Sequence, residues 1–320
     1  MTTATIRAGR PAVLDHLEAV VLAARQSSTE ARLGMAIAAF GWTAIVLLAR
    51  PGLPWSTAQE ALCYFLPSLS APYVLSDWTS PVAYVYSPAF LQLLSPLTGL
   101  PWQIFVGVWA AILFGAVRFL AGPRLFWLAV IAAGPELIGG NIALLITVAI
   151  VLGFRWPAMW SFVLLTKITP GIGLLWFAAR REWRNLGIAL GATMAVVTVS
   201  AVAAPSAWID WLQVLERSVG HSPTSAAVPI PFVVRLPIAV AIVVWGARTD
   251  RRWAVPVAAM VALPALWFGG FSMLLGVVAL RMQDADRPPR ITGGRTAGAA
   301  AARESGRAPS FGRTQEPVLG

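Results

Sequence analysis

Clusters of arginine divide this chain into apolar runs, and this pattern most constrains how the chain can fold. The sequence has 24 lysine and arginine residues, and all of them except Lys167 are arginines. The runs between the clusters have helical rather than alternating hydrophobicity, and many of the 15 tryptophans lie near their ends. Membrane helices carry aromatic residues at their interfaces, whereas the strands of a transmembrane β-barrel alternate. The sequence therefore predicts an all-α, polytopic helical membrane protein.

The composition excludes a soluble globule. Hydrophobic residues make up 58% of the chain and charged residues 12%, whereas a soluble domain has about 25% charged residues. In a membrane protein the net charge of +10 is a signal of orientation, so we expect membrane lipids and no nucleic acid as partners. The single cysteine, Cys63, excludes an intrachain disulfide.

The positive-inside rule fixes a topology, because 20 of the 24 basic residues fall on one side when the arginine clusters are placed in the cytoplasm. Residues 1–32 are then a cytoplasmic leader, whose apolar residues repeat at helical spacing and predict an amphipathic helix. Residues 33–280 form the transmembrane domain. Residues 281–320 have too few apolar side chains to fold and are expected to be a disordered cytoplasmic tail. Both termini are predicted to be cytoplasmic.

This topology has about ten membrane segments and two long external loops, residues 50–101 and 204–232. A hairpin between Arg124 and Arg155 is expected to turn at 135–141. The last pair of membrane segments is expected to turn at Gly269-Gly270. The expected segments are 33–49, 102–120, two short helices between 124 and 155, two between 155 and 180, 186–203, 233–247 and a pair within 254–280.

Lys167 lies inside an apolar segment, where an ammonium group costs roughly 2.5 to 3.5 kcal/mol on insertion scales. We therefore expect it to have an anionic partner. Pro170 and Gly171 interrupt a continuous helix, which favours a hairpin with Lys167 at its turn. A single crossing between Arg155 and Arg180, which are separated by 24 residues, is the alternative.

The first external loop contains two acids, Glu60 and Asp77, among aromatic residues that include Tyr64, Tyr84 and Tyr86. A sugar site needs a carboxylate that accepts a hydroxyl proton and apolar ring faces beside it. The alternative is a loop at the membrane interface, where tyrosine is common and the acids are solvated.

Further polar residues lie in the second external loop and in the hairpin after Arg124. Arg217 and Arg235 lie on the external side in this topology, against the positive-inside rule. Their expected partners are therefore either lipid head groups or a substrate phosphate. His221 is either solvated, or it shares in acid-base chemistry or binds phosphate. Glu136 is either functional or the counter-ion of Lys167.

Three stretches resemble a known family: YVYSPAFLQLLSPLTGLP at 84–101, GGNIALLITVAIVLGF at 139–154 and KITPGIGLLWFAARREWR at 167–184. They are similar to the polytopic glycosyltransferases of family 87, which are polyprenyl-phosphate-mannose-dependent mannosyltransferases with the GT-C fold. The similarity extends over about residues 33–245.

The resemblance implies that an acid four residues before a tyrosine in the first external loop is the catalytic base. Glu60 before Tyr64 corresponds to it, although the family usually has Asp there, and Asp77 is the second candidate. Asn141 corresponds to the last residue of a Gly-Gln-x-Asn segment that lacks its Gln here. The sequence His221-Ser222 lies where the family has Asn-Gln-Ser.

The resulting hypothesis is a cell-membrane hexosyltransferase with an extracytoplasmic active site. It would transfer mannose from a polyprenyl-phosphate donor to a lipid or glycan acceptor, without a metal or cofactor. The alternatives are a lipid-linked sugar flippase, or a binding or scaffold subunit of the cell envelope, without chemistry. The predicted catalytic residues are Glu60, Asp77 and His221, and the predicted substrate- or phosphate-binding residues are Lys167, Arg217, Arg235, Tyr64, Tyr84, Tyr86 and Asn141.

Overall fold

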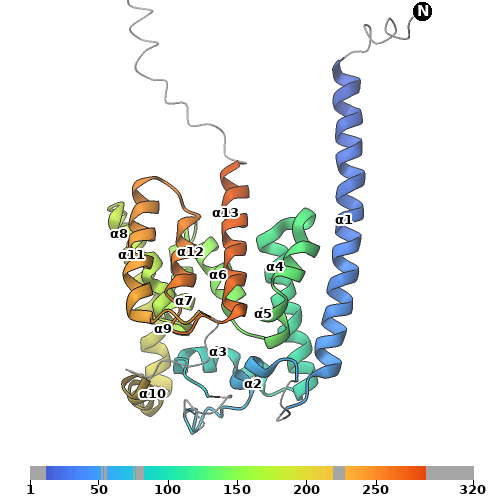
Figure 1. Cartoon of the computed structure of the whole chain (residues 1–320). Coiled ribbons are helices and arrows are strands. Elements are labelled where there is room, and N and C mark those ends of the chain that lie inside the picture. The colour runs from blue at the N-terminus through green and yellow to red at the C-terminus, as the bar shows by residue number, and fades with distance from the viewer. Residues whose placement is uncertain are drawn as a thin grey trace, which may run out of the picture. The chain divides into compact units, whose positions relative to one another are not determined.

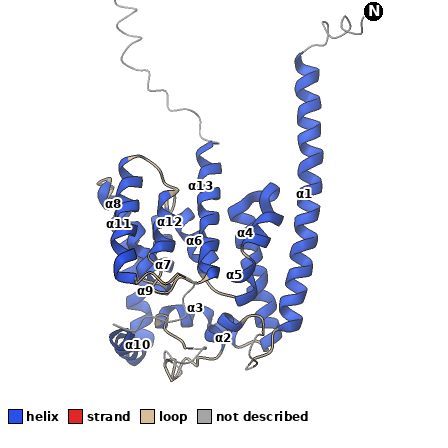
Figure 2. Cartoon of the chain, in the orientation of Figure 1, coloured by secondary structure: helices blue, strands red, loops and turns tan. Residues whose placement is uncertain are grey.

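The computed structural model describes residues 12–51, 53, 56–74, 76, 83–218 and 228–285, with side chains from residue 29 onward. In this part of the chain every helix or strand element is a helix, which confirms the all-α prediction (Figure 2). The elements in chain order are α1 (Ala12–Leu48), α2 (Gln59–Phe65), α3 (Pro88–Thr98), α4 (Trp102–Ala132), α5 (Gly134–Gly139), α6 (Ala143–Gly153), η1 (Pro157–Met159), α7 (Trp160–Thr166), η2 (Thr169–Leu174), α8 (Leu175–Ala179), α9 (Trp183–Ala203), α10 (Pro205–Ser218), α11 (Phe232–Arg248), α12 (Ala254–Val261), η3 (Phe268–Leu274) and α13 (Leu275–Ala285).

Within the described residues, three helical segments are long and apolar enough to cross a membrane: residues 29–48 of α1, all of α4, and α9. The three apolar helical segments between α5 and α9, residues 143–153, 157–166 and 169–179, have 10 or 11 residues each, so none of them reaches the length of about 20 residues that a single crossing needs. Three helices that meet the length criterion are fewer than the ten segments expected from the arginine pattern.

The helix α4 consists of two helices that meet at a break. Gly122 has φ 68° and ψ 176°, a conformation that glycine adopts without the steric cost of a Cβ. Pro123 follows, and a proline ring cannot continue the hydrogen-bond ladder of the preceding turn. The sequence predicted this division, with one helix over 102–120 and the next after Arg124.

The N-terminal helix differs from the prediction. We expected an amphipathic leader helix separate from a membrane segment that starts near residue 33. Instead, α1 runs without interruption from Ala12 to Leu48 (Figure 1). No glycine or proline lies between Ala12 and Gly34, so nothing in that stretch ends a helix.

The turn at Lys167 confirms the predicted hairpin. Lys167 is extended, with φ −131° and ψ 112°, between the end of α7 and the start of η2. The two arms pack against each other, because the rings of Trp160 in α7 and Phe177 in α8 are 6.4 Å apart between centroids. The turn expected at Gly269-Gly270 lies earlier, between α12 and η3, and both glycines belong to η3.

Three arginine-bearing turns and Arg281 of α13 meet at one end of the helices. Arg180 contacts the α11–α12 connection, since it donates to the carbonyl oxygen of Ala247 at 3.0 Å and pairs with Asp250 at 2.9 Å. The guanidinium of Arg252 lies 5.6 Å above the ring of Phe154 at the end of α6, and that of Arg281 lies 4.9 Å above the ring of Trp253. Because Phe154 follows α6 and Asn141 precedes it, this arginine end and Asn141 are at opposite ends of α6.

The short helices α2 and α3 belong to the long connection between α1 and α4. They lie across the ends of the longer helices in Figure 1, and α2 packs against α3, α4 and α5. Thr57 donates to the carbonyl oxygen of Ile45 at 2.6 Å, which anchors the start of α2 to the last turns of α1. The connection therefore covers the end of the bundle opposite the turns that carry Arg155, Arg180 and Arg252.

Candidate active site

The start of α2 is fixed to α5, and the α5–α6 connection is fixed to α4. The N–H of Ala58 donates to the carbonyl oxygen of Ile138 in α5 at 2.6 Å. The indole N–H of Trp109 in α4 donates to the carbonyl oxygen of Gly140 at 2.7 Å. Gly140 has φ 74°, and a Cβ at this position would lie 2.8 Å from the Cβ of Ala61. A side chain here would combine a left-handed conformation with a steric clash, so the close approach of α2 requires glycine.

Asn141 joins three segments that are far apart in the sequence. Its Oδ1 atom accepts hydrogen bonds from the Tyr64 hydroxyl at 3.2 Å, from Lys167 Nζ at 3.5 Å and from the N–H of Ile142 at 2.6 Å. The Tyr64 hydroxyl also lies 3.2 Å from that of Tyr86. The structure thus brings together four residues that the sequence analysis proposed separately: Tyr64, Tyr86, Asn141 and Lys167.

Glu60 lies one helical turn before Tyr64, and its carboxyl group is next to Gly139. A Cβ on Gly139 would lie 3.6 Å from the Cδ atom of Glu60 and 3.7 Å from its Oε2 atom. Partial burial raises the pKa of the Glu60 carboxyl, and the nearby ammonium group of Lys167 lowers it by a smaller amount. The ammonium and the carboxylate therefore belong to one electrostatic site.

The polar and aromatic parts of this cluster differ in exposure. Glu60, Asn141 and Lys167 are partly exposed, whereas Tyr64 and Tyr86 are buried. Lys167 Nζ lies 6.0 Å from the centroid of the Tyr86 ring, a weak cation–π contact. The groups that a substrate can reach are thus a carboxylate, an amide and an ammonium, supported by two tyrosines.

Buried aromatic rings pack behind the two tyrosines. The ring centroid of Tyr64 is 5.2 Å from that of Tyr86, 5.6 Å from that of Phe90 and 5.3 Å from that of Trp109. The Tyr73 hydroxyl donates to the carbonyl oxygen of Tyr86 at 2.8 Å. The sequence analysis missed Trp109, although a tryptophan seven residues inside an apolar helix is far from the interface where tryptophan usually lies.

The N-terminus of α6 is closed to anions. The first N–H groups of a helix usually form an anion-binding site. Here the N–H of Ile142 donates to Asn141 Oδ1, and those of Ala143 and Leu144 donate to Glu136 Oε1 at 2.5 and 3.3 Å. Lys167, and not the N-terminus of α6, is therefore the positively charged group of this cluster that can bind a phosphate.

The other predicted site residues lie elsewhere or are not described. Tyr84 is buried, and its hydroxyl donates to the carbonyl oxygen of Ser87 at 3.1 Å. Arg217 is exposed on α10, where its Nε donates to the carbonyl oxygen of Gln213 at 3.2 Å. Asp77 and His221 lie outside the described residues.

Arg235 has a different environment from the one we expected for a phosphate ligand. Its side chain is buried, with 4% exposed, and it donates to four backbone carbonyl oxygens between 2.7 and 2.9 Å away. These carbonyls belong to Ile230, Val261, Leu263 and Pro264. A guanidinium group has five N–H donors, so this arginine binds the connection after α12 and has one donor left. The sequence could not show this, because three of the acceptors lie 26 to 29 residues away.

We expect Arg235→Leu to lower the free energy of unfolding by at least about 3 kcal/mol, because several buried carbonyls would lose their donor. Thermal unfolding of the purified protein in detergent measures this loss. Arg248→Leu is the matched control, since Arg248 is exposed on the same helix. Unchanged stability together with weaker binding of a phosphorylated ligand would instead restore Arg235 as a phosphate ligand.

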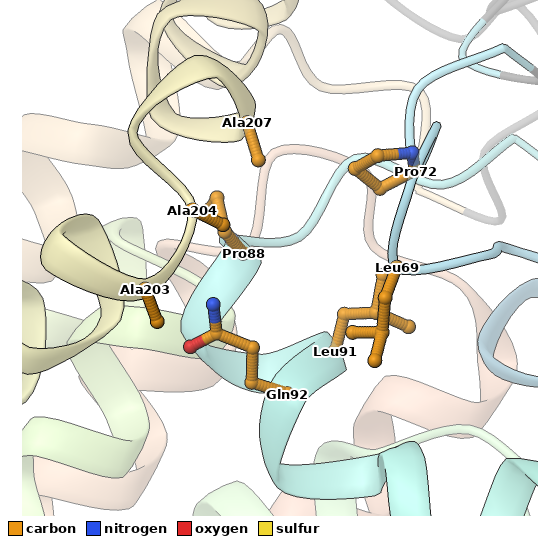
Figure 3. Close-up of a pocket in the computed structure, with 8 residues that line it drawn as sticks. All are labelled: Leu69, Pro72, Pro88, Leu91, Gln92, Ala203, Ala204 and Ala207. Carbon is orange, nitrogen blue, oxygen red and sulfur yellow. The ribbon is translucent and has the colours of Figure 1, made fainter.

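A cavity of about 390 Å³ adjoins the segment that carries Tyr86, because Pro88, two residues later, is part of its lining (Figure 3). It is bounded by α3, by the loop before it, and by the junction of α9 and α10. Its lining is apolar except for Gln92, whose Nε2 donates to the carbonyl oxygen of Ser200 at 3.3 Å. The lining residues are Leu69, Pro72, Pro88, Leu91, Gln92, Ala203, Ala204 and Ala207. This lining suits a hydrocarbon group and not a phosphate or a sugar.

Within the described residues, no group of three or more His, Cys, Asp or Glu side chains comes together in a way that could hold a metal ion.

Comparison with protein families gives one match: the model of glycosyltransferase family 87 matches residues 84–299. No curated protein and no solved structure matches the chain. The matched region includes Tyr86, Asn141 and Lys167, whereas Glu60 and Tyr64 precede it. Because the match covers more than half of the sequence, the chain belongs to glycosyltransferase family 87 and is a membrane glycosyltransferase.

Proposed function

We propose that the protein transfers a sugar, mannose, from a polyprenyl-phosphate donor to a lipid or glycan acceptor on the extracytoplasmic side of the membrane. The observation that carries this proposal is the convergence of Glu60, Asn141 and Lys167, from three separate segments, into one partly exposed cluster. A carboxylate and a cation side by side are what glycosyl transfer from a phosphate requires.

In this mechanism Glu60 is the general base. Its carboxylate accepts the proton of the acceptor hydroxyl while the hydroxyl oxygen attacks the anomeric carbon of the sugar. The bond between that carbon and the phosphate oxygen breaks, and its electron pair leaves with the polyprenyl phosphate. Attack opposite the leaving group inverts the configuration at the anomeric carbon.

Lys167 stabilises the departing phosphate in this scheme. An ammonium group has three N–H donors, and Lys167 directs one of them to Asn141 at 3.5 Å, a long hydrogen bond. It also forms a hydrogen bond with the side chain of Tyr86, so one donor remains that can bind a phosphate oxygen. A cation held where negative charge develops is among the largest contributions to catalysis.

Tyr64 and Tyr86 have a supporting role in the proposed site. Their rings are buried, so the ring faces are covered by protein and do not stack on a sugar. The Tyr64 hydroxyl binds Asn141 and lies 3.2 Å from the hydroxyl of Tyr86, and the side chain of Tyr86 contacts Lys167. We therefore assign them to the alignment of the polar groups and leave Tyr84, Arg217 and Arg235 out of the proposed site.

The proposed topology places about ten segments in the membrane, as in the GT-C fold, with the arginine end in the cytoplasm. The helices shorter than a full crossing form hairpins, and two of them turn at the cluster, one near Asn141 and one at Lys167. Backbone breaks at membrane depth are tolerated where they line a protein site. The cluster at the opposite end of α6 then faces the extracytoplasmic side.

We propose that the apolar cavity binds the isoprenoid part of the donor, because it adjoins the segment that carries Tyr86. We expect Ala203→Phe to raise KM for the donor about tenfold with little change in kcat, since the ring would displace about two CH2 groups of the ligand. The kinetics of purified protein at varied donor concentration measure this. Val202→Phe, at the neighbouring exposed position outside the lining, is the control and should leave KM unchanged.

The direct test of the function is transfer by purified protein in proteoliposomes, with a radiolabelled polyprenyl-phosphate mannose and a panel of lipid and glycan acceptors. Product that appears with mannose and not with other polyprenyl-phosphate sugars supports the whole proposal. Product with another sugar would correct the donor. Donor binding without product for any acceptor would contradict catalysis and favour the flippase or binding subunit.

A further inference from the structure

Glu136 is a buried carboxylate next to the cluster, and the mechanism above does not use it. Its side chain is 1% exposed, and its Oε1 atom accepts the N–H groups of Ala143 and Leu144 in the first turn of α6. Its Oε2 atom accepts no hydrogen bond from the described residues and lies against Gly269 of η3. A Cβ on Gly269 would be 2.5 Å from that oxygen, so the backbone of η3 packs directly on the carboxylate.

The contacts of Glu136 lead to Asn141. Three consecutive N–H groups at the start of α6 are bound by these two side chains. The N–H of Ile142 donates to Asn141, and those of Ala143 and Leu144 donate to Glu136. Asn141 immediately precedes these residues, so the position of its amide depends on how this turn is held. The same amide oxygen contacts Tyr64 and Lys167.

Glu136 also lies on the element that contacts Glu60. The helix α5 begins two residues before Glu136, and its end provides both the Ile138 carbonyl that binds Ala58 and the Gly139 backbone beside the Glu60 carboxyl group. The Glu136 carboxylate thus ties α5 to α6. The end of α5 contacts Glu60, the proposed base. Asn141, just before α6, contacts Lys167, the proposed phosphate ligand.

Glu136 is not the counter-ion of Lys167 by direct contact. Among the residues that the structure describes, no ion pair within 4.0 Å joins Glu136 to Lys167. The carboxylate is instead engaged with the backbone, where it opposes the positive end of the α6 dipole.

We propose that Glu136 is a positioning residue that sets the distance between Glu60 and the Asn141–Lys167 pair by fixing the first turn of α6 to α5. It acts through Asn141 and does not touch the substrate. The expected effect on kcat rests on the proposed function. The expected effect on the first turn of α6 rests on the backbone contacts.

The variants Glu136→Gln and Glu136→Ala separate positioning from charge. Glutamine has the same shape and keeps an oxygen for the two N–H groups, so we expect kcat to stay within about threefold of the wild type. Alanine removes the acceptor, and a displacement of about 1 Å at a catalytic group costs about a hundredfold in rate. We therefore expect kcat to fall by about that factor in Glu136→Ala. A similar loss in both variants would overturn the proposal, because it would mean that the negative charge itself is needed.

Double-mutant cycles test whether the effect passes through Asn141. We expect Glu136→Ala to lower kcat much less in an Asn141→Ala background than in the wild type, because the partner it positions is already lost. Equal loss in both backgrounds would contradict this path. Glu182→Ala is the matched control for loss of a carboxylate at a helix start: Glu182 precedes α9 and accepts hydrogen bonds from Arg180 and Asn185 at the arginine end. It should leave kcat unchanged.

Hydrogen exchange keeps the structural part testable without activity. In the full-length protein in detergent, the amides of residues 142–144 should exchange about tenfold faster in Glu136→Ala and at the wild-type rate in Glu136→Gln. Unchanged exchange in Glu136→Ala would overturn the positioning role even in an active enzyme. Faster exchange in a protein that transfers no sugar would support the contact and refute the proposed function instead.

Discussion

Purified protein that carries Glu60→Gln should transfer sugar at least about a hundredfold more slowly than the wild type, which is the lower range for removal of a general base. Glutamine keeps the size of the side chain but cannot accept a proton from the acceptor hydroxyl. We expect KM for the donor to change little, since the donor phosphate is assigned to Lys167. Initial rates at saturating donor and acceptor measure the effect.

Glu216→Gln is the control for Glu60→Gln, because Glu216 is an exposed acid on α10 and should be dispensable. Glu60→Asp should keep more activity than Glu60→Gln, since a carboxylate remains but is shorter by one methylene group. If Glu60→Gln transfers sugar at the wild-type rate, Glu60 is not the base, and Asp77 becomes the residue to test.

The pH dependence provides an independent check on Glu60. Burial raises the pKa of its carboxyl group above the ordinary glutamate value, and the base must be deprotonated. The rate should therefore rise with pH through a limb that lies above the ordinary titration range of glutamate. Since the Lys167 ammonium lowers this pKa, its removal should move the limb of the residual activity to higher pH. A limb that stays in place would contradict their proximity.

The second large effect is expected for Lys167→Met. Methionine is similar in length and has no charge, so the departing phosphate would lose its cation in a site where solvent is largely excluded. Loss of one such stabilising donor costs about a hundredfold to a thousandfold in kcat. Steady-state kinetics with a polyprenyl-phosphate sugar donor measure this loss.

Lys167→Arg should recover part of the activity, because it keeps the charge with a different shape. Arg184→Met is the control, since Arg184 is an exposed cation at the arginine end. Wild-type kcat in Lys167→Met would show that the phosphate is bound elsewhere. A rise in KM alone would show that Lys167 binds the donor equally in the ground state and in the transition state.

Local signals predicted much of the fold. Pro170 and Gly171 indicated the turn at Lys167, because proline and glycine act on their own backbone. Arg118 and Arg124 indicated the division of α4, because the positive-inside rule ends a membrane segment at an arginine cluster. The predicted leader helix and the first membrane segment are continuous in the structure, since hydrophobic spacing gives the face of a helix and not the residue where it ends. The structure has one helix from Ala12 to Leu48.

The site could be predicted only in part. Lys167 was proposed because an ammonium group in an apolar segment needs an anionic partner, and Glu60 because it is an acid among aromatic residues, four residues before a tyrosine as in family 87. Their arrangement around Asn141 was not predictable, since Tyr64 and Asn141 are 77 residues apart and no periodic pattern relates them. For the same reason Arg235 looked like a phosphate ligand: its carbonyl partners belong to a distant connection whose approach depends on tertiary packing.

The length of α6 has a consequence for the surrounding lipid. Its 11 residues span about 16 Å, roughly half of the hydrocarbon thickness of about 30 Å. In the proposed topology the backbone just before α6 therefore lies well below the outer head groups. Trp109, whose indole binds this backbone at Gly140, is about 10 Å along α4 from the first turn of α4. A charged donor reaches this depth most easily where the bilayer is locally thin, so hydrophobic mismatch becomes part of how this protein meets its substrate.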